Sequence, residues 1–328
     1  MAAAPRTDHA ERWHVIDAAG PWANPVTLAE IAGRGEPTLL VGDGGLTAAA
    51  AAAGLTRAAR LPAAGGDARW AVANLRRFFR SAGPVRSLHA WSPTAAAALR
   101  WAGLPSGARR TLHLTATPDA CQLKRIGGLA RGWDVQTASP RTARRLRGVG
   151  VETAMIDAMP ARGVRPAADA HAGPARAALR ARWGVDDDTP VVAAWADPPA
   201  AADTMRAAMT VNLVAEAAGR ELRLLVHPLQ HARARTQDLL DRYGHPDRLI
   251  QDAGLAAPWS VLSGLDAVML GDDPAPLSVR YALAAGVPVV APDTPDHRHA
   301  VGDAGVSYAL TGEPKRLADR LLHGALGS

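Results

Sequence analysis

Short apolar runs alternate with helix-length segments along most of the chain. In the first half, six runs have the length and apolar composition of buried strands: Trp13–Ala18, Thr38–Gly42, Ser87–Trp91, Arg110–Thr115, Asp134–Ala138 and Thr153–Ile156. Alanine-rich or amphipathic segments of helix length lie between them, among them Asp67–Arg80, Pro93–Ala102 and Pro140–Gly148. Strands that alternate with helices in this way predict a parallel α/β sheet.

The same alternation restarts after a segment that interrupts it. Met159–Pro174 contains Pro and Gly without apolar periodicity, which predicts an interdomain linker. Beyond it we expect strands at Val191–Trp195, Leu222–Val226, Arg248–Gln251, Ala267–Leu270 and Pro288–Ala291. Helices are expected at Ala175–Trp183, Ala200–Ala218, Ala232–Tyr243, Pro258–Leu265, Pro276–Ala285 and Pro314–His323. The pattern predicts two Rossmann-like doubly wound α/β domains, 1–162 and 163–328, that face each other across a cleft.

Composition is that of a folded protein of the cytoplasm. The 328 residues suffice for two domains, and 48% hydrophobic with 21% charged residues is typical of a globular chain. The single cysteine, Cys121, excludes an internal disulfide and a cysteine-based zinc cluster, which fits a reducing compartment. We find no export signal and no run of about 18 apolar residues, so we expect a cytoplasmic protein without a transmembrane segment.

The basic residues are almost all arginine. Net charge is +6 and the pI is about 10.3, and Lys124 and Lys315 are the only lysines among 37 basic residues. A basic balance favours anionic ligands or nucleic acid. An arginine excess combined with an alanine excess is also typical of a GC-rich genome, and we favour this explanation. Arg141, Arg144 and Arg145 share one helical face. We favour a solvated surface for this face over a binding site for an anionic acceptor or nucleic acid.

The segment Asp266–Tyr308 carries the strongest indication of a site. It predicts a buried strand, a loop that begins with Asp272 and Asp273, a helix, and a second buried strand. In open parallel sheets, ligands bind beyond the carboxyl ends of the strands. The start of the helix leaves backbone N–H groups for an anion, and we expect those of Leu277 and Ser278 to hold a phosphate.

Several phrases of the sequence resemble the GT-B glycosyltransferases, and specifically the large family 4 of retaining nucleotide-sugar transferases. They are LHAWSPTAAAALRWAG, TLHLTATPD, DVQTASPRTARRLRGVGVE and, most recognisably, YALAAGVPVVAPD at Tyr281–Asp293. Ser139 matches a serine that opens a helix in the family. The resemblance implies sugar transfer with retention, a nucleotide-sugar as co-substrate and no resident cofactor or metal. It implies that His89 or His113 faces an unknown acceptor and that Asp273 lies near the donor sugar.

The sequence departs from the family where the donor binds. Members carry two glutamates separated by seven residues. The first lies beside the donor sugar and the second binds the ribose hydroxyls. The matching positions in this sequence are Asp273 and Tyr281. A tyrosine cannot accept two ribose hydrogen bonds as a carboxylate does. Members also have Arg and Lys after the first strand of the second domain, but AAWADPPAAADTMR has no cation before Arg206. Loss of such donors raises the barrier to diphosphate departure by several kcal/mol.

The donor-binding set that we predict from these positions includes substitutes for the missing cations. Its members are Trp195, Arg206, His227, Asp272, Pro276, Leu277, Ser278, Arg280 and Tyr281. Plainer explanations stay open for several of them. For Arg206 and Arg280 we favour solvated helix faces, and for His227 a strand end. Asp272 and Asp273 are equally typical of a helix cap.

Other patterns carry less information. The turn in Val41–Gly54 lacks a full GxGxxG and an acidic partner, so dinucleotide binding is weakly indicated. Two further groups have metal-ligand residues, His227 with His231 and the loop that holds Asp293, Asp296, His297 and His299. Pro228 disfavours a helix through the first group, and sequence cannot show convergence in the second, so we expect no metal.

Three hypotheses follow. The leading one is a glycosyltransferase-like protein that binds a nucleotide-sugar donor in the second domain and an acceptor in the first. The second is a catalytically inactive relative that acts as a binding or scaffold protein. The third, nucleic-acid binding through the arginine surface, is the least favoured and requires affinity that falls steeply with salt.

Overall fold

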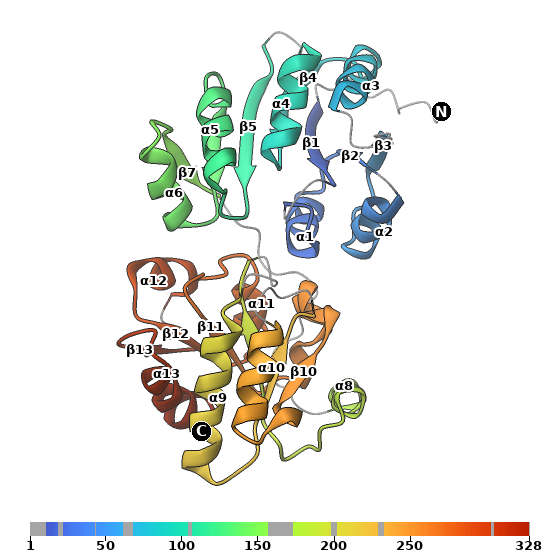
Figure 1. The fold of residues 1–328 in the computed structure, drawn as a ribbon. Helices are drawn as coiled ribbons and strands as arrows, with labels where there is room; N and C mark the ends of the chain where they lie inside the picture. The colour runs from blue at the N-terminus through green and yellow to red at the C-terminus, as the bar shows by residue number, and fades with distance from the viewer. Residues whose placement is uncertain are drawn as a thin grey trace. The chain divides into compact units, whose positions relative to one another are not determined.

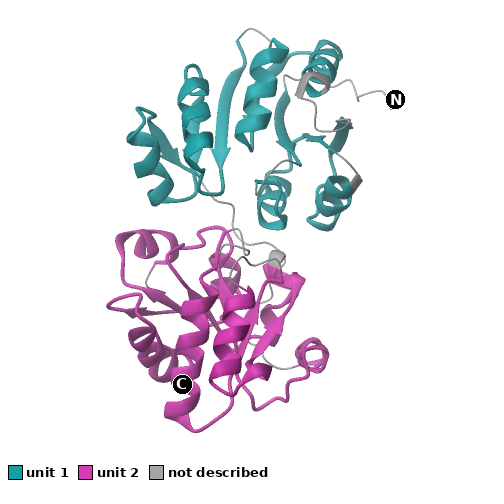
Figure 2. Cartoon of the chain, in the orientation of Figure 1, with its two compact units in different colours: residues 1–159 teal, residues 160–328 magenta. Residues whose placement is uncertain are grey.

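The chain divides into two compact units, Met1–Met159 and Pro160–Ser328 (Figure 2). The computed structural model describes residues 11–18, 22–42, 44–61, 68–103, 107–156, 173–197, 202–228, 233–302 and 305–327. The predicted linker Met159–Pro174 lies outside these residues except for its last two positions. Each unit is described separately below.

Unit 1 is built on a sheet of seven parallel strands in the order β3-β2-β1-β4-β5-β6-β7 (Figure 1). The strands are β1 (Glu11–Asp17), β2 (Thr38–Val41), β3 (Ala58–Leu61), β4 (Val85–Ala90), β5 (Arg109–Leu114), β6 (Asp134–Thr137) and β7 (Thr153–Met155). The helices are α1 (Pro25–Arg34), α2 (Gly44–Ala52), α3 (Ala68–Ser81), α4 (Pro93–Ala102), α5 (Ala120–Leu129) and α6 (Pro140–Arg147). The strand order reverses between β1 and β4.

Helices cover both faces of the unit 1 sheet because its strands are apolar on both sides. Val15 of β1 packs in one buried cluster with residues of α3, α4 and α5, including Leu75 and Leu99. The next residue, Ile16, points to the opposite face and packs in a second cluster with Leu28 of α1. This alternation on a two-sided core is what a doubly wound parallel sheet requires.

Unit 2 repeats the architecture with six parallel strands in the order β10-β9-β8-β11-β12-β13. The strands are β8 (Val191–Trp195), β9 (Arg223–Val226), β10 (Leu249–Gln251), β11 (Ala267–Leu270), β12 (Val289–Pro292) and β13 (Val306–Ala309). The helices are α8 (Pro174–Trp183), α9 (Thr204–Ala218), α10 (Arg233–Arg242), α11 (Val279–Ala284), α12 (Pro295–Val301) and α13 (Pro314–Arg320), which continues as a π-helical turn, Leu321–Ala325. The order reverses between β8 and β11. The predicted fold class, two Rossmann-like doubly wound units, is confirmed.

Several predicted elements need correction. Pro258–Leu265 is not an α-helix but two short 3-10 turns, Pro258–Ser260 and Leu262–Gly264. The helix predicted from Pro276 begins only at Val279. The supposed loop with Asp293 and His297 contains helix α12. Two edge strands, β3 and β13, were not predicted, because AARL and VSYA lack the fully apolar run of a buried strand.

Gly264 shows how closely one of these turns packs. A Cβ atom at this position would lie 2.4 Å from Cζ3 of Trp183 and 2.6 Å from its Cη2. The Trp183 ring cannot retreat freely, because its Nε1–H donates to Asp252 at 2.7 Å. Glycine at this position therefore lets α8 pack against the turn.

We expect Gly264→Ala to lower the free energy of unfolding by about 1–3 kcal/mol, the usual cost of overpacking a core. Gly128→Ala is the matched control, since no atom lies within 4 Å of a Cβ there and the residue is in helix α5. That change should be neutral or stabilising by up to about 1 kcal/mol. Urea unfolding of both variants measures the difference, and equal effects would contradict the packing argument.

Candidate functional site

The carboxyl ends of β8 and β11 meet at the switch point of the unit 2 sheet, where ligands of open α/β sheets bind. Asp197 follows β8, and Asp272 and Asp273 follow β11. Acidic side chains therefore follow both strands at this edge of the unit 2 sheet, and the guanidinium of Arg206 contacts one of them, Asp272.

The carboxylate of Asp197 binds the start of the α11 segment. It accepts the backbone N–H groups of Leu277 at 2.8 Å and Ser278 at 3.2 Å, and the Ser278 hydroxyl donates to its other oxygen. Asp197 and Ser278 are both buried. Burial raises the pKa of Asp197, while the hydrogen bonds from Ser278 and Leu277 oppose that shift. The N–H groups expected to hold a phosphate are therefore engaged by a side chain of the protein itself.

The loop before α11 is fixed by a second aspartate. Asp273 Oδ1 accepts the N–H of Ala275 at 2.8 Å and lies 3.5 Å from the backbone nitrogen of Asp197. Ala275 has φ +44°, a left-handed conformation that is uncommon for a residue with a Cβ atom. This conformation turns the chain before Ser278, and the half-buried Pro276 lies in the same turn.

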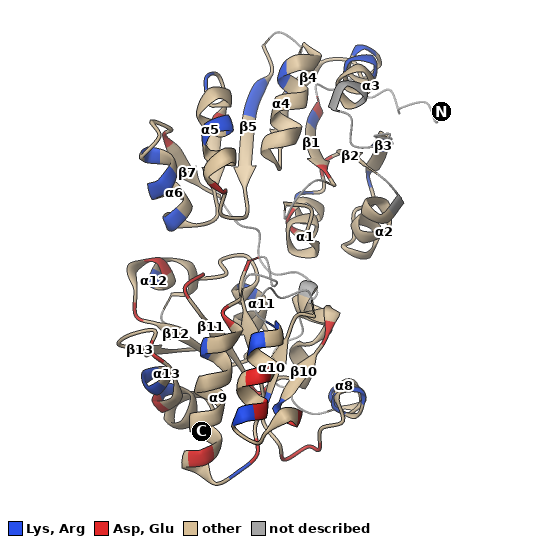
Figure 3. Cartoon of the chain, viewed as in Figure 1, with Lys and Arg blue, Asp and Glu red and all other residues tan. Residues whose placement is uncertain are grey.

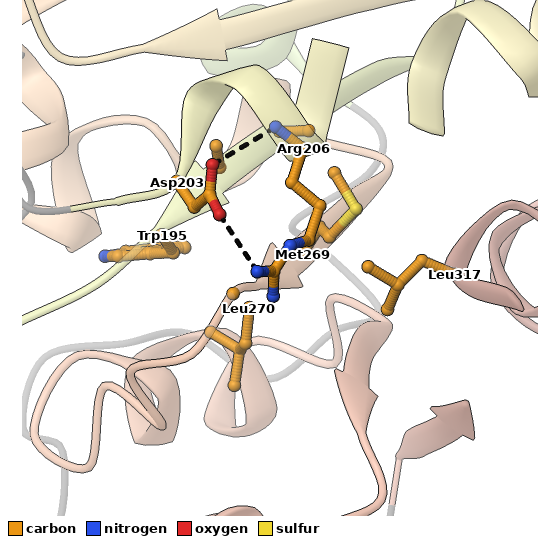
Figure 4. Close-up of a pocket in the computed structure, with 9 residues that line it drawn as sticks. Trp195, Asp203, Arg206, Met269, Leu270 and Leu317 are labelled. Atoms are coloured by element: carbon orange, nitrogen blue, oxygen red, sulfur yellow. Dashed lines mark hydrogen bonds and ion pairs between the residues drawn. The ribbon is translucent and has the colours of Figure 1, made fainter. Parts of the chain in front are cut away.

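Arg206, the first cation after β8, is already paired with two aspartates. Its guanidinium donates to Asp272 at 2.6 Å and lies 3.2 Å from Asp203, which also caps α9 (Figure 4). The hydrogen bond with Asp272 raises the pKa of Arg206. The adjacent cavity, lined by Trp195 and Leu317 among others, holds about 10 Å³, roughly the room for one water molecule. Within it there is no room for a sugar.

The remaining predicted donor residues lie in or near the core of unit 2. Tyr281 is buried, and its ring centroid lies 5.2 Å from that of Trp259 and 5.4 Å from the Arg280 guanidinium. Arg280 is half-buried, and its positive charge partly opposes the burial that raises the pKa of Asp197. His227 is mostly buried, and burial lowers its pKa. Trp195 is fully buried, and its Nε1 has no hydrogen-bond partner among the described residues.

In unit 1 the structure brings the two predicted histidines together. His89 Nδ1 lies 3.0 Å from His113 Nε2, and His89 Nε2 lies 3.0 Å from the Ser87 hydroxyl. The indole of Trp91 stacks on His113 with ring centroids 4.2 Å apart. Burial lowers the pKa of His89 to about 4 and that of His113 well below its usual value. Both rings are therefore neutral near pH 7 and able to exchange one hydrogen bond.

His14 and Glu36 also belong to this group, and neither was predicted from the sequence. Trp91 Nε1–H donates to His14 Nδ1 at 2.8 Å, and an indole N–H can only donate. His14 must therefore carry its proton on Nε2, which lies 2.7 Å from a carboxylate oxygen of Glu36. The hydrogen bond from His14 lowers the pKa of Glu36 to about 2. His14 pairs with His89 in the register of β1 and β4, which the sequence alone does not reveal.

Charge is distributed unevenly between the two units (Figure 3). Residues 1–159 contain 20 Lys and Arg against 11 Asp and Glu, whereas residues 160–328 contain 17 against 20. On α6, Arg141 and Arg144 are exposed and Arg145 is half-buried. Ser139, at the start of the same helix, is buried. The basic excess of the chain belongs to unit 1, whereas the predicted phosphate position is in unit 2.

The described residues contain no group of three or more His, Cys, Asp or Glu side chains placed to hold a metal ion. Asp293 instead pairs with Arg298, and His297 bonds to Thr294 and to the Gly271 carbonyl. His231 lies outside the described residues. No helix in the described segments is long and apolar enough to cross a bilayer.

The sequence matches no family model and no curated protein, but solved structures share its fold. HepE of Anabaena, solved with UDP-glucose, has a TM-score of 0.67 at 15% identity over 96% of this chain and 90% of that one. A glycosyltransferase of Rickettsia africae reaches 0.65 at 11% identity over 98% and 90%. The UDP-GlcNAc 2-epimerase of Methanocaldococcus jannaschii reaches 0.55 at 10% over 97% and 93%. The chain therefore has the fold of GT-B glycosyltransferases, a fold that sugar-nucleotide epimerases share.

The histidine network predicts acid sensitivity. His14, His89 and His113 all have a lowered pKa in the folded protein, so the unfolded chain binds protons first as the pH falls below about 6.5. The free energy of unfolding should therefore fall between pH 7.5 and 5.5.

His89→Gln removes one of these protonations, so the fall should be smaller by about 1.4 kcal/mol. The exposed His323, replaced by Gln, is the control and should leave the fall unchanged. Urea unfolding at the two pH values measures it. An unchanged pH dependence in the His89 variant would show that the network does not control stability.

Proposed function

We propose that this chain is a glycosyltransferase-like protein of the family 4 type. It binds a nucleotide-sugar at the carboxyl edge of the unit 2 sheet and transfers the sugar with retention to an acceptor held by unit 1. The support is twofold: the fold extends over nearly the whole length of a UDP-glucose-bound transferase, and the loop Asp272–Ser278 lies at the switch point of unit 2.

The residues take the following parts in this proposal. Asp273, half-buried at the loop, lies beside the donor sugar, and the N–H groups of Leu277 and Ser278 receive the diphosphate. His89, the more accessible member of the histidine pair, faces the acceptor with His113 behind it. No metal or resident cofactor takes part, and the nucleotide-sugar is a co-substrate.

A second candidate is a catalytically inactive relative that acts as a binding or scaffold protein. The contact between Asp197 and the α11 segment favours it, because a carboxylate already occupies the phosphate position. The pairing of Arg206 with Asp203 and Asp272 also favours the inactive relative. These two carboxylates offset the positive charge that would stabilise a departing diphosphate. In this reading the fold persists without sugar transfer.

The release of UDP from UDP-glucose in water separates the two candidates without knowledge of the acceptor. For an active transferase, Asp273→Asn should lower this rate at least 100-fold, the usual effect of removing one electrostatic contact to a transition state. UDP affinity, measured by calorimetry, should change less than threefold.

Asp293→Asn is the control for this experiment. Asp293 pairs with the exposed Arg298, and we expect full activity after its replacement. A wild-type protein that binds UDP but releases none from UDP-glucose or from other UDP-sugars would favour the inactive relative. Absence of UDP, GDP and ADP binding at millimolar concentration, both by the wild-type protein and by Asp197→Ala, would contradict the donor site itself.

A further inference from the structure

The same contact between an aspartate and a serine closes the switch point of each unit. In unit 1, the hydroxyl of Ser92 donates to Asp17 at the end of β1. In unit 2, the hydroxyl of Ser278 donates to Asp197 beyond β8. All four side chains are at least nine-tenths buried. The two contacts occupy corresponding places, because β1 with β4 and β8 with β11 are the strand pairs at which the order reverses.

The two contacts differ in which side chain binds the backbone N–H groups at the start of the following helical segment. In unit 1, Ser92 caps α4 through the N–H of Ala95, and its hydroxyl donates to Asp17. In unit 2, Ser278 makes no cap of its own. Asp197 takes its place and accepts two backbone N–H groups together with the hydroxyl. In unit 2 the carboxylate thus takes two backbone N–H groups and a hydroxyl, which are donors that a phosphate oxygen also takes.

The unit 2 contact is also held from the other side. Asp273 Oδ1 lies 3.5 Å from the Asp197 backbone nitrogen, while Asp197 binds the residues that follow Asp273. The loop before α11 and the residue after β8 are thus connected by two contacts, one from each aspartate side chain. Because Asp197 belongs to the same chain, it competes for the N–H groups of Leu277 and Ser278 at a high effective concentration. A free ligand must displace Asp197 before it can bind them.

We propose that Asp197 is an autoinhibitory latch, whose carboxylate occupies the N–H and hydroxyl donors of Leu277 and Ser278 and keeps a nucleotide diphosphate out until it is displaced. The inference rests on the proposed function, since it concerns the same donor position. A carboxylate and a diphosphate carry charge of the same sign and cannot share these donors. The Asp17 contact of unit 1 is then a structural counterpart without an inhibitory role.

UDP binding by three variants, followed by calorimetry, tests the latch. Asp197→Ala vacates the donors, and UDP should bind at least tenfold more tightly than to the wild-type protein. Asp197→Asn removes the charge but keeps an acceptor and nearly the same volume. Asp197→Asn replaces the alanine variant in the test if the latter does not fold. It should bind UDP at least threefold more tightly than the wild-type protein. Asp17→Ala removes the corresponding unit 1 contact and should leave UDP affinity within twofold of wild type.

Three results would overturn the latch, and they differ in what else they overturn. Equal UDP affinity in the wild-type protein and in both Asp197 variants would remove the inhibitory role and leave the donor site standing. No UDP binding by any variant, with folding confirmed by thermal unfolding, would remove the donor site and the latch together. A gain of affinity in Asp17→Ala as large as in Asp197→Ala would show a general loosening of the fold and would also overturn it.

Discussion

A single buried carboxylate organises the part of unit 2 where a ligand is expected. Asp197 receives the N–H groups that begin the α11 segment, and with Asp273 it holds the intervening loop in place. A buried carboxylate is stable only when hydrogen bonds replace its lost hydration, and here three donors do so. Because we propose that the same donors bind the diphosphate, this contact bears on both the stability and the proposed function of unit 2.

The surroundings of this contact agree with its effect. Arg206, which could attract a diphosphate, is paired with two aspartates, and Tyr281 is packed against Trp259 where the ribose-binding carboxylate was expected. Acidic residues outnumber basic ones in the second unit as a whole. Each feature reduces the positive potential that a sugar nucleotide would meet at this edge of the sheet. The chain thus combines the fold of GT-B glycosyltransferases with a proposed donor position at which Arg206 is paired with aspartates.

Much of the fold could be predicted from the sequence, because the apolar runs of β1, β2, β8 and β11 are those of strands buried on both faces. The edge strand β3 could not, because half of its residues are exposed and none is fully buried. The late start of α11 also escaped prediction, since the left-handed Ala275 gives no signal in the residue type. Only glycine or asparagine would have indicated that conformation.

The candidate site was predicted less well, for a reason of distance along the chain. Asp197 lies 80 residues before its partner Leu277, and no local pattern links them. His14 joins Trp91 across 77 residues and was missed likewise. Positions within one loop, such as Asp273 and Ser278, were located because a strand and a following helix frame them. Which side chain fills the space between two loops depends on the packed sheet.

Amide hydrogen exchange at Leu277 and Ser278 in the wild-type protein tests the central contact most directly. If Asp197 holds these N–H groups, both amides should exchange slowly, with protection comparable to that of the neighbouring strand β11. Exchange of both at the rate of an unstructured peptide, while β11 stays protected, would contradict the account.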